Sequence, residues 1–312
     1  MTVTSRRCSQ RSAAEPRWAT QATPGRENFA GPVDAVAAVL GFGGLMPWQS
    51  SAIGTATEEI RGVPAYRQVT IEVPRQQGKS VGILSLMVAR GIENPGTMIS
   101  YSAQTRLAGR RRMLDVWWPR IRRSPLRKLI DPRKGYGSEA FIFRNGSMIM
   151  LASGTEASDH GDTLDMAVID EAWAQRDAAI EQAVKPAMMT RDHAQLWVVS
   201  TAGNELSSYF RGKVEDGRAM AGSGATDTAA YFGYSAPDDA DPADPAVWYG
   251  CMPALGITVS EETVRADFGT MDLAEFRRAY LCQWPEVAKP GWATVTEAAW
   301  MACADPRLRP SA

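Results

Sequence analysis

Residues 73–80 read Val73-Pro74-Arg75-Gln76-Gln77-Gly78-Lys79-Ser80 and end in the Gly-Lys-Ser signature of a phosphate-binding loop. The apolar stretch 68–73 before them predicts a buried strand, and the apolar spacing over 79–90 predicts a helix. A loop between a strand and a helix N-terminus presents backbone N–H groups to an anion. Val73 occupies the first glycine position of G-x-x-x-x-G-K-[ST]. On this motif alone, a glycine-capped turn before an ordinary helix is therefore an equal alternative.

In a nucleotide-binding loop of this kind, the lysine contacts the β- and γ-phosphates of ATP and the serine binds Mg²⁺. These roles would fall to Lys79 and Ser80. The other candidate nucleotide-binding residues of the loop are Pro74, Arg75, Gln76, Gln77 and Gly78.

A second apolar stretch, 166–169, runs into two adjacent carboxylates, Asp170 and Glu171. Ligands of α/β sheets bind at the carboxyl ends of the strands. There, Asp170 would help to hold Mg²⁺, and Glu171 would orient and polarise the attacking water. Acids after a strand more often cap a helix. The phosphate-loop motif upstream reverses that preference, because both features then lie at one sheet edge.

A third predicted strand, 196–200, leads into Ser200-Thr201-Ala202-Gly203-Asn204. Small polar side chains at such a strand end can sense the γ-phosphate, which makes Ser200, Thr201 and Asn204 candidate coupling residues. A plain strand-to-helix turn is the alternative.

The wider pattern of strands and helices predicts an α/β fold. Strands alternate with helical stretches, which indicates a mostly parallel central sheet flanked by helices. Asn145-Gly146 between two apolar runs predicts a hairpin. We expect a flexible N-terminal arm over 1–32, an ATPase core over 33–205, a smaller and mostly helical lid subdomain over 206–290, and a linker over 291–312.

The composition fits an ordinary globular protein of 312 residues, with 45% hydrophobic residues, 22% charged residues and a net charge of -1. That charge balance gives no support to a protein that coats nucleic acid. Four cysteines without C-x-x-C spacing and two histidines argue against a zinc site, and the cysteines are expected to be reduced, as in the cytosol. No apolar run approaches the roughly 20 residues that span a bilayer, and no secretory signal is present, so we expect no membrane contact.

Together these motifs resemble the ATPase half of tailed-bacteriophage large terminase subunits. The residues 73–80 are similar to that family's phosphate loop, which commonly lacks the first glycine and carries Arg-Gln in the middle. Pro47-Trp48-Gln49 is similar to its adenine-recognition motif, with Gln49 as the base reader. The resemblance extends over residues 34–300. Its other motifs are VIDEAW at 168–173, STAGN at 200–204 and FRRAYLCQW at 276–284.

The resemblance implies a P-loop NTPase of the additional-strand, catalytic-glutamate type that hydrolyses ATP with Mg²⁺. Arg75 would match the family's loop arginine, and we count it with Lys79 and Glu171 as catalytic. The family forms a homo-oligomeric ring on the portal protein of a procapsid, works with a small terminase subunit, and pumps double-stranded DNA inward. The expected location is the host cytoplasm, at the procapsid portal.

The sequence departs from the family in two places. The family often has a trans-acting arginine finger about ten residues before the catalytic glutamate, where this chain has His160. Neutral imidazole cannot replace a guanidinium fork. Either another arginine serves, with Arg110, Arg112 and Arg144 as the candidates for a trans-acting or DNA-contacting arginine, or hydrolysis relies less on a finger. The family also continues into a nuclease domain. Only twelve residues follow Trp300, so we expect no endonuclease activity from this chain, and leave open whether it belongs to a longer protein.

Residues 106–134 hold eleven basic residues and two acidic ones, together with Trp117 and Trp118. This stretch is either a DNA-contacting or neighbour-subunit surface, or a solvated helix face with the tryptophans in the core, which we slightly favour. The leading interpretation of the whole chain is a motor ATPase of viral DNA packaging. A helicase-like P-loop translocase and a non-catalytic nucleotide-binding scaffold are the alternatives.

Overall fold

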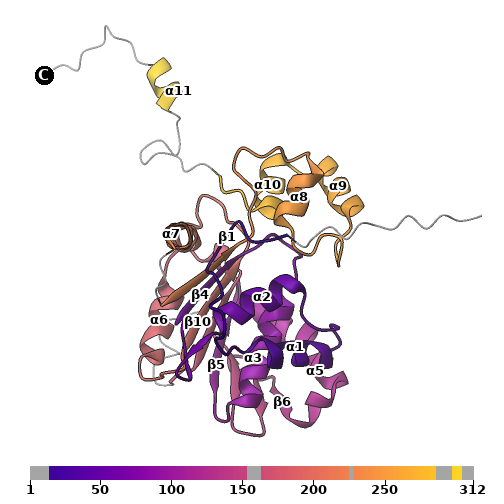
Figure 1. Ribbon diagram of the computed structural model, residues 1–312, viewed down its shortest axis with the longest axis vertical. Helices are drawn as coiled ribbons and strands as arrows, with labels where there is room; N and C mark the ends of the chain where they lie inside the picture. The colour runs from indigo at the N-terminus through magenta and orange to yellow at the C-terminus, as the bar shows by residue number, and fades with distance from the viewer. Residues whose placement is uncertain (1–13, 153–162, 225–227, 286–296, 304–312) are drawn as a thin grey trace, which may run out of the picture.

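The computed structural model describes residues 14–152, 163–224, 228–285 and 297–303 (Figure 1). In these ranges the strands form a nine-stranded sheet in the order β1-β11-β4-β10-β9-β5-β8-β7-β6, and β2 pairs with β3 separately. The strands are β1 (Trp18–Ala19), β2 (Glu59–Ile60), β3 (Val63–Pro64), β4 (Gln68–Glu72), β5 (Met98–Ser102), β6 (Ile130–Arg133), β7 (Ala140–Phe143), β8 (Met148–Leu151), β9 (Met166–Asp170), β10 (Gln195–Ser200) and β11 (Ala229–Gly233).

The helices lie on both sides of this sheet and above one of its edges. They are α1 (Ala30–Val39), α2 (Pro47–Ala56), α3 (Lys79–Glu93), α4 (Arg106–Arg111), the π-helix η1 (Arg112–Trp117), α5 (Trp118–Arg123), the 3₁₀-helices η2 (Pro125–Lys128) and η3 (Ala172–Ala174), α6 (Ala179–Met188), α7 (Ser208–Ser223), α8 (Pro245–Cys251), α9 (Glu261–Thr270), α10 (Leu273–Leu281) and α11 (Glu297–Ala302).

The six central strands from β11 to β8 run parallel, while β1, β7 and β6 pair antiparallel. β10 lies between β4, which leads into the phosphate loop, and β9, which carries the acidic pair. A strand inserted at this place defines the additional-strand class of P-loop NTPases. The predicted fold class is confirmed, as is the hairpin of β7 and β8.

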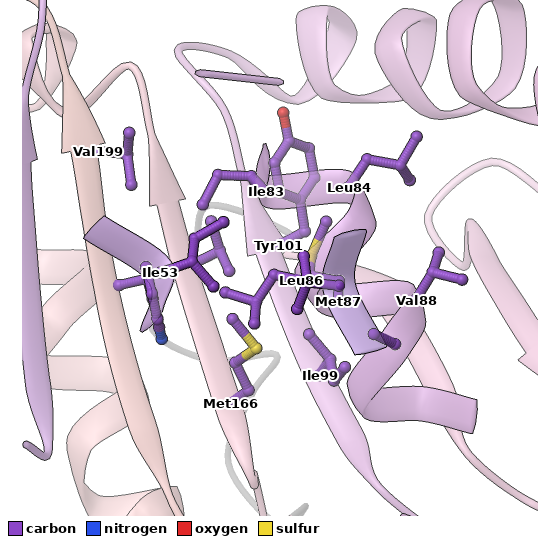
Figure 2. Packing of buried hydrophobic residues seen from close by; sticks show 14 of the residues in the cluster. Ile53, Ile83, Leu84, Leu86, Met87, Val88, Ile99, Tyr101, Met166 and Val199 are labelled. Atoms are coloured by element: carbon purple, nitrogen blue, oxygen red, sulfur yellow. The ribbon is translucent and has the colours of Figure 1, made fainter. Parts of the chain in front are cut away.

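The side chains of each strand alternate between two cores, because successive residues of a strand point to opposite faces. In β10, Trp197 and Val199 pack under α1, α2 and α3, whereas Leu196 and Val198 pack under α6 and α7. Figure 2 shows the first of these cores, with Ile83, Leu86 and Met87 of α3 lying toward the labelled residues of β5 and β9. Both faces are covered, which is why these strands are apolar throughout.

A third core belongs to the helices α8, α9 and α10, which form the C-terminal helical subdomain. Trp248, Phe268 and Phe276 pack there as a group, with ring centroids 5.0 to 6.2 Å apart. Residues 261–281 form two separate helices, because α9 ends at Thr270 and Asp272 caps α10 by accepting from the Ala274 N–H at 2.9 Å.

The sheet continues past the domain boundary predicted at residue 205. β11 pairs with β4 over five residues, and α7 packs on the same face of the sheet as α6. The helical subdomain therefore begins after Gly233. Sequence reasoning missed β11 because its partner strand lies about 160 residues upstream, and the pairing leaves no local pattern.

Part of the predicted arm over 1–32 contacts the core. β1 extends the sheet by pairing with β11, and the Thr23 N–H donates to Glu58 Oε1 at 2.7 Å. Residues 1–13, and most of the linker predicted over 291–312, lie outside the described residues.

The basic stretch after β5 forms consecutive helical segments, α4, η1 and α5, with a π-helical turn in the middle. Trp117 is buried against Tyr101, and Trp118 packs on Phe141, so both tryptophans belong to the core. None of the helices in the described ranges is long and apolar enough to span a membrane.

Candidate functional site

The phosphate loop joins β4 to α3, and its tight path depends on two residues with left-handed backbone. Gln76 has φ 61°, and Gly78, which caps α3, has φ 87°. A Cβ added to Gly78 would press on Met46 and lie 2.8 Å from Gln49 Nε2. Only glycine fits there without strain, so the Gly-Lys-Ser motif is fixed by packing as well as by its backbone conformation.

Gln49 and Trp48, at the start of α2, brace this loop from behind. Gln49 Nε2 donates to Gly78 O at 2.8 Å, while its Oε1 accepts from the Met46 N–H at 2.7 Å. Trp48 Nε1 donates to Gln77 O at 3.0 Å. Gln49 is buried, and its amide holds the loop in the described structure. Its role as the base reader stays a prediction.

Lys79 brings together the ends of three strands. The side chain leaves the first turn of α3, is only 8% exposed, and donates from Nζ to Thr201 Oγ1 at 2.9 Å, just after β10. Its ammonium also lies 3.8 Å from Glu171 Oε1, just after β9. Thr201 in turn donates to Val73 O at 3.0 Å. The predicted meeting of the loop, the acidic pair and the third strand end is thus present in the structure.

Asp170 is fully buried, and both of its carboxylate oxygens have partners. Oδ1 accepts from the Glu171 N–H at 3.0 Å, and Oδ2 accepts from the Tyr101 hydroxyl at 2.9 Å and from Arg112 Nη1. Burial raises the pKa of the Asp170 carboxyl, while the Arg112 guanidinium opposes the shift and Glu171 adds to it. Burial acts to lower the pKa of Arg112, but Tyr101, Asp170 and Glu171 outweigh it, so that pKa is raised.

Glu171 is held by its own backbone and by a tryptophan. It has φ 56°, which is uncommon for a residue with a Cβ and concentrates at functional sites. Trp173 Nε1 donates to Glu171 Oε2 at 3.0 Å, and the Trp173 N–H donates to Ser200 Oγ at 3.0 Å. A Cβ at Gly203 would lie 2.2 Å from Ser207 Oγ and 3.2 Å from the Trp173 Cβ, so the glycine of the 200–204 segment makes room chiefly for Ser207.

The three candidate coupling residues fall into two groups. Ser200 and Thr201 are buried beside Lys79 and Trp173. Asn204 is exposed, and its Oδ1 accepts from the Leu206 N–H at 3.0 Å, within its own turn ahead of α7. In the described structure Asn204 therefore shapes this turn and contacts neither Lys79 nor Glu171.

The candidate finger arginines also separate. Arg110 donates to Glu139 Oε1 at 2.7 Å, a buried carboxylate that Arg106 also binds, so its guanidinium is held within the chain. Arg112 contacts Asp170 of its own site. Arg144 lies in the turn of the β7–β8 hairpin, whose Asn145 bonds Gly91 O near the far end of α3.

α3 has 15 residues, so Arg144 lies about 20 Å from the phosphate loop, given a rise of about 1.5 Å per residue. Arg144 is therefore too far from the phosphate loop of its own chain to contact a nucleotide there. His160 lies outside the described residues.

The C-terminal helical subdomain touches the phosphate loop directly, which sequence reasoning missed. The Arg75 N–H donates to Ala279 O at 2.8 Å, and Arg75 Nη1 lies 3.2 Å from Glu275 Oε1. The Ala254 N–H donates to Gln77 Oε1 at 2.7 Å. No local signal marks these contacts, since each joins residues about 180 or more positions apart.

Arg278 and Trp173 form the other junction between that subdomain and the site. Arg278 Nη1 donates to Ala202 O at 2.8 Å, and its guanidinium lies 5.2 Å from the centre of the Trp173 ring. A cavity of about 710 Å³ opens on this side, lined by Trp173, Asn204, Glu275, Arg278 and Trp284 among others. No residue from 74–80 is among its lining residues in the described ranges, so it lies beside the phosphate cradle.

The donor set fits Mg²⁺ bound together with a nucleotide. Within the described residues no group of three or more His, Cys, Asp or Glu side chains could hold a metal by itself. Mg²⁺ in nucleotide sites uses one or two protein oxygens and completes its shell with phosphates and water. Ser80 at the start of α3 and Asp170 at the end of β9 can supply those oxygens. The nearly buried Lys79 ammonium suits an anionic phosphate.

Comparison with known proteins identifies the fold. The chain is similar to the large terminase of bacteriophage HK97, with a TM-score of 0.69 and 20% identity over 83% of this chain and 56% of that one. It is also similar to a single-residue variant of the large terminase ATPase domain of Thermus phage P74-26, with a TM-score of 0.51 and 15% identity over 70% of this chain and 90% of that one. The chain thus spans just over half the length of the HK97 protein. No protein-family model matches the sequence, and a search of curated proteins returned no match.

Proposed function

We propose that this chain, whose fold is that of large terminase ATPase domains, is an ATP-hydrolysing motor of viral DNA packaging that moves double-stranded DNA into a procapsid. The observation that carries the proposal is the placement of Glu171. Its carboxylate lies 3.8 Å from the Lys79 ammonium and accepts the Trp173 indole N–H at 3.0 Å. A nucleotide-binding scaffold has no need for a carboxylate held in this way beside the phosphate-loop lysine.

Each residue of the site has a role in this chemistry. The loop from Gln76 to Gly78 would offer backbone N–H groups to the phosphates, and Lys79 would neutralise the β- and γ-phosphates. Ser80 and Asp170 hold Mg²⁺, which, when bound, stabilises the charge that builds up on the phosphate oxygens. Glu171 orients the attacking water and accepts its proton.

Thr201 connects hydrolysis to the rest of the fold. It accepts from Lys79 Nζ at 2.9 Å and donates to Val73 O at 3.0 Å. A change in what Lys79 contacts therefore reaches both β10 and the start of the loop. From there Arg278, bonded to Ala202 O, can pass it to the helical subdomain.

The partners that we propose are those that the sequence resemblance implies. The HK97 and P74-26 proteins are large terminases. We accordingly propose double-stranded DNA, a portal protein and a small terminase subunit as partners of a homo-oligomeric ring in the host cytoplasm, at the procapsid portal.

The decisive experiment compares steady-state ATP hydrolysis by the wild type and by Glu171→Gln, with and without duplex DNA. Loss of the base is expected to lower kcat by about 10²- to 10⁴-fold, while ATP still binds. Glu205→Gln, which changes an exposed acid close by, is the matched control and should keep wild-type turnover.

Wild-type protein that binds ATP without turnover, even with duplex DNA and at concentrations that drive assembly, would contradict the ATPase proposal. Turnover that responds to single-stranded DNA and not to duplex would contradict the packaging role.

A further inference from the structure

The consecutive residues Arg110, Arg111 and Arg112 have three different surroundings. Successive residues of an α-helix point about 100° apart, so the first and third of them face nearly opposite sides. Arg110 binds the buried Glu139, Arg111 is exposed, and Arg112 reaches Asp170 in the nucleotide site. One residue of a run of like charges is thus directed inward by the phase of the helix.

The inward position of Arg112 is secured by the helix that carries it. η1, a π-helix, starts at Arg112, and π-helical turns occur frequently at functional sites. Met113 and Trp117 anchor this turn in the core. The Trp117 ring packs on Tyr101 with centroids 4.8 Å apart, and Tyr101 also bonds Asp170. Figure 2 shows the Tyr101 hydroxyl directed away from Ile99 and the core.

The charges of the site are balanced without any ligand. Asp170 and Glu171 contribute two negative charges, and Lys79 and Arg112 contribute two positive ones at the same strand ends. Oδ2 of Asp170 already has two donors, and Arg112 supplies the only positive charge paired with Asp170 among the described ion pairs. A divalent cation that approaches this carboxylate must compete with the guanidinium.

We propose that Arg112 is a positioning residue that competes with Mg²⁺ for Asp170: it neutralises the aspartate before the nucleotide binds and releases it when Mg²⁺ arrives with the phosphates. This inference rests on the proposed nucleotide function. The phosphates bring the negative charge that the released guanidinium then faces. Mg²⁺ without nucleotide gains little from the site, because Arg112 already satisfies Asp170.

The test measures nucleotide binding and needs neither turnover nor DNA. A fluorescent ADP analogue is titrated in EDTA and in Mg²⁺. The Kd in EDTA divided by the Kd in Mg²⁺ measures how much Mg²⁺ strengthens nucleotide binding. In Arg112→Gln this ratio should rise about tenfold over wild type, a change of about 1.4 kcal/mol. Without the competing guanidinium, Mg²⁺ binds more readily, and metal-free ADP meets two unbalanced carboxylates.

Arg111→Gln is the matched control. It removes the same charge at the neighbouring residue, whose side chain is exposed. Its ratio should stay at the wild-type value. An unchanged ratio in Arg112→Gln, or an equal rise in both variants, overturns the proposal. Wild-type protein that binds ADP in neither buffer contradicts the nucleotide function itself, so the two failures can be told apart.

A second variant covers the case in which Arg112→Gln does not fold with an unpaired buried aspartate. Arg112→Lys keeps the charge but lacks the planar fork and holds a carboxylate less firmly. The ratio for Arg112→Lys should rise about threefold over wild type, because the lysine competes with Mg²⁺ for Asp170 less strongly than the arginine does. A ratio equal to that of the wild type in a folded Arg112→Lys protein overturns the proposal.

Discussion

Glu171 illustrates how a single carboxylate is prepared for its task. Its left-handed backbone turns the side chain toward Lys79, and the Trp173 indole fixes one oxygen. The Arg278 guanidinium in turn lies over the Trp173 ring. In its proposed role as general base, a carboxylate oriented in this way would spend less of its time in unproductive rotamers.

We therefore expect Trp173→Phe to lower kcat about tenfold and to leave KM within about twofold, since it removes one N–H bond to a charged group and keeps the ring. Steady-state kinetics checks both values. Trp248→Phe is the control, because it loses an indole bond of 2.8 Å to Pro242 O in the core of the helical subdomain. Equal losses of kcat in both variants would mean that a general loss of stability, and not orientation of Glu171, is responsible.

Among the elements, β4 is tied to its surroundings by a buried carboxylate at its last residue. Glu72 accepts from Arg218 Nη2 at 3.0 Å, from the Tyr231 hydroxyl at 2.8 Å and from Trp284 Nε1 at 2.6 Å. α7, β11 and the segment after α10 thus meet at the residue before the phosphate loop. Burial raises the pKa of the Tyr231 hydroxyl, and Glu72 adds to that shift, so the phenol stays a donor.

Replacing this carboxylate should be costly. Glu72→Gln removes the negative charge that pairs with the buried side of the Arg218 guanidinium, and we expect the free energy of unfolding to fall by about 3 to 5 kcal/mol. Glu215→Gln, which breaks an exposed ion pair with Arg211 on the same helix, should cost less than about 0.5 kcal/mol. Urea unfolding of the three proteins measures both differences, and similar midpoints would refute the buried network as a stabilising contact.

The elements also show what the sequence alone can predict. β4, α3, β9 and β10 were predictable because each is a local apolar run next to a polar motif, and parallel strands place those motifs at one edge. β1 and β11 were not, since their pairing partners are distant in the chain. Among the eleven basic residues of 106–134, only the phase of the folded helix selects Arg112 for the site.

On the scale of the whole molecule, the basic stretch is less available to DNA than its composition suggests. Arg106, Arg110 and Arg112 are paired with carboxylates. The exposed positive charges gather instead around the end of α5 and η2, and they include Arg122, Arg123, Arg127 and Lys128. Arg144 adjoins this group, because its N–H donates to Leu129 O at 2.9 Å.

This surface makes a prediction about DNA. Arg122→Glu combined with Arg123→Glu should weaken duplex binding and reduce the slope of log Kd against log salt by about two, one for each phosphate that is no longer neutralised. Fluorescence anisotropy at several salt concentrations measures the slope. Arg265→Glu, at an exposed position on α9 of the helical subdomain, should leave the slope unchanged. A reduced slope in Arg265→Glu, with an unchanged slope in the double variant, would place the DNA-binding surface on that subdomain instead.

The position of Trp284 has a mechanical consequence. Arg211 Nη1 donates to the Pro285 carbonyl at 3.0 Å, and the neighbouring Trp284 is bonded to Glu72. A pulling force applied to the chain at Pro285 therefore reaches the base of the phosphate loop, through Trp284 and Glu72, before it loads any helix of the subdomain. The hydrogen bond between Trp284 and Glu72 thus connects tension along this part of the chain to the shape of the phosphate loop.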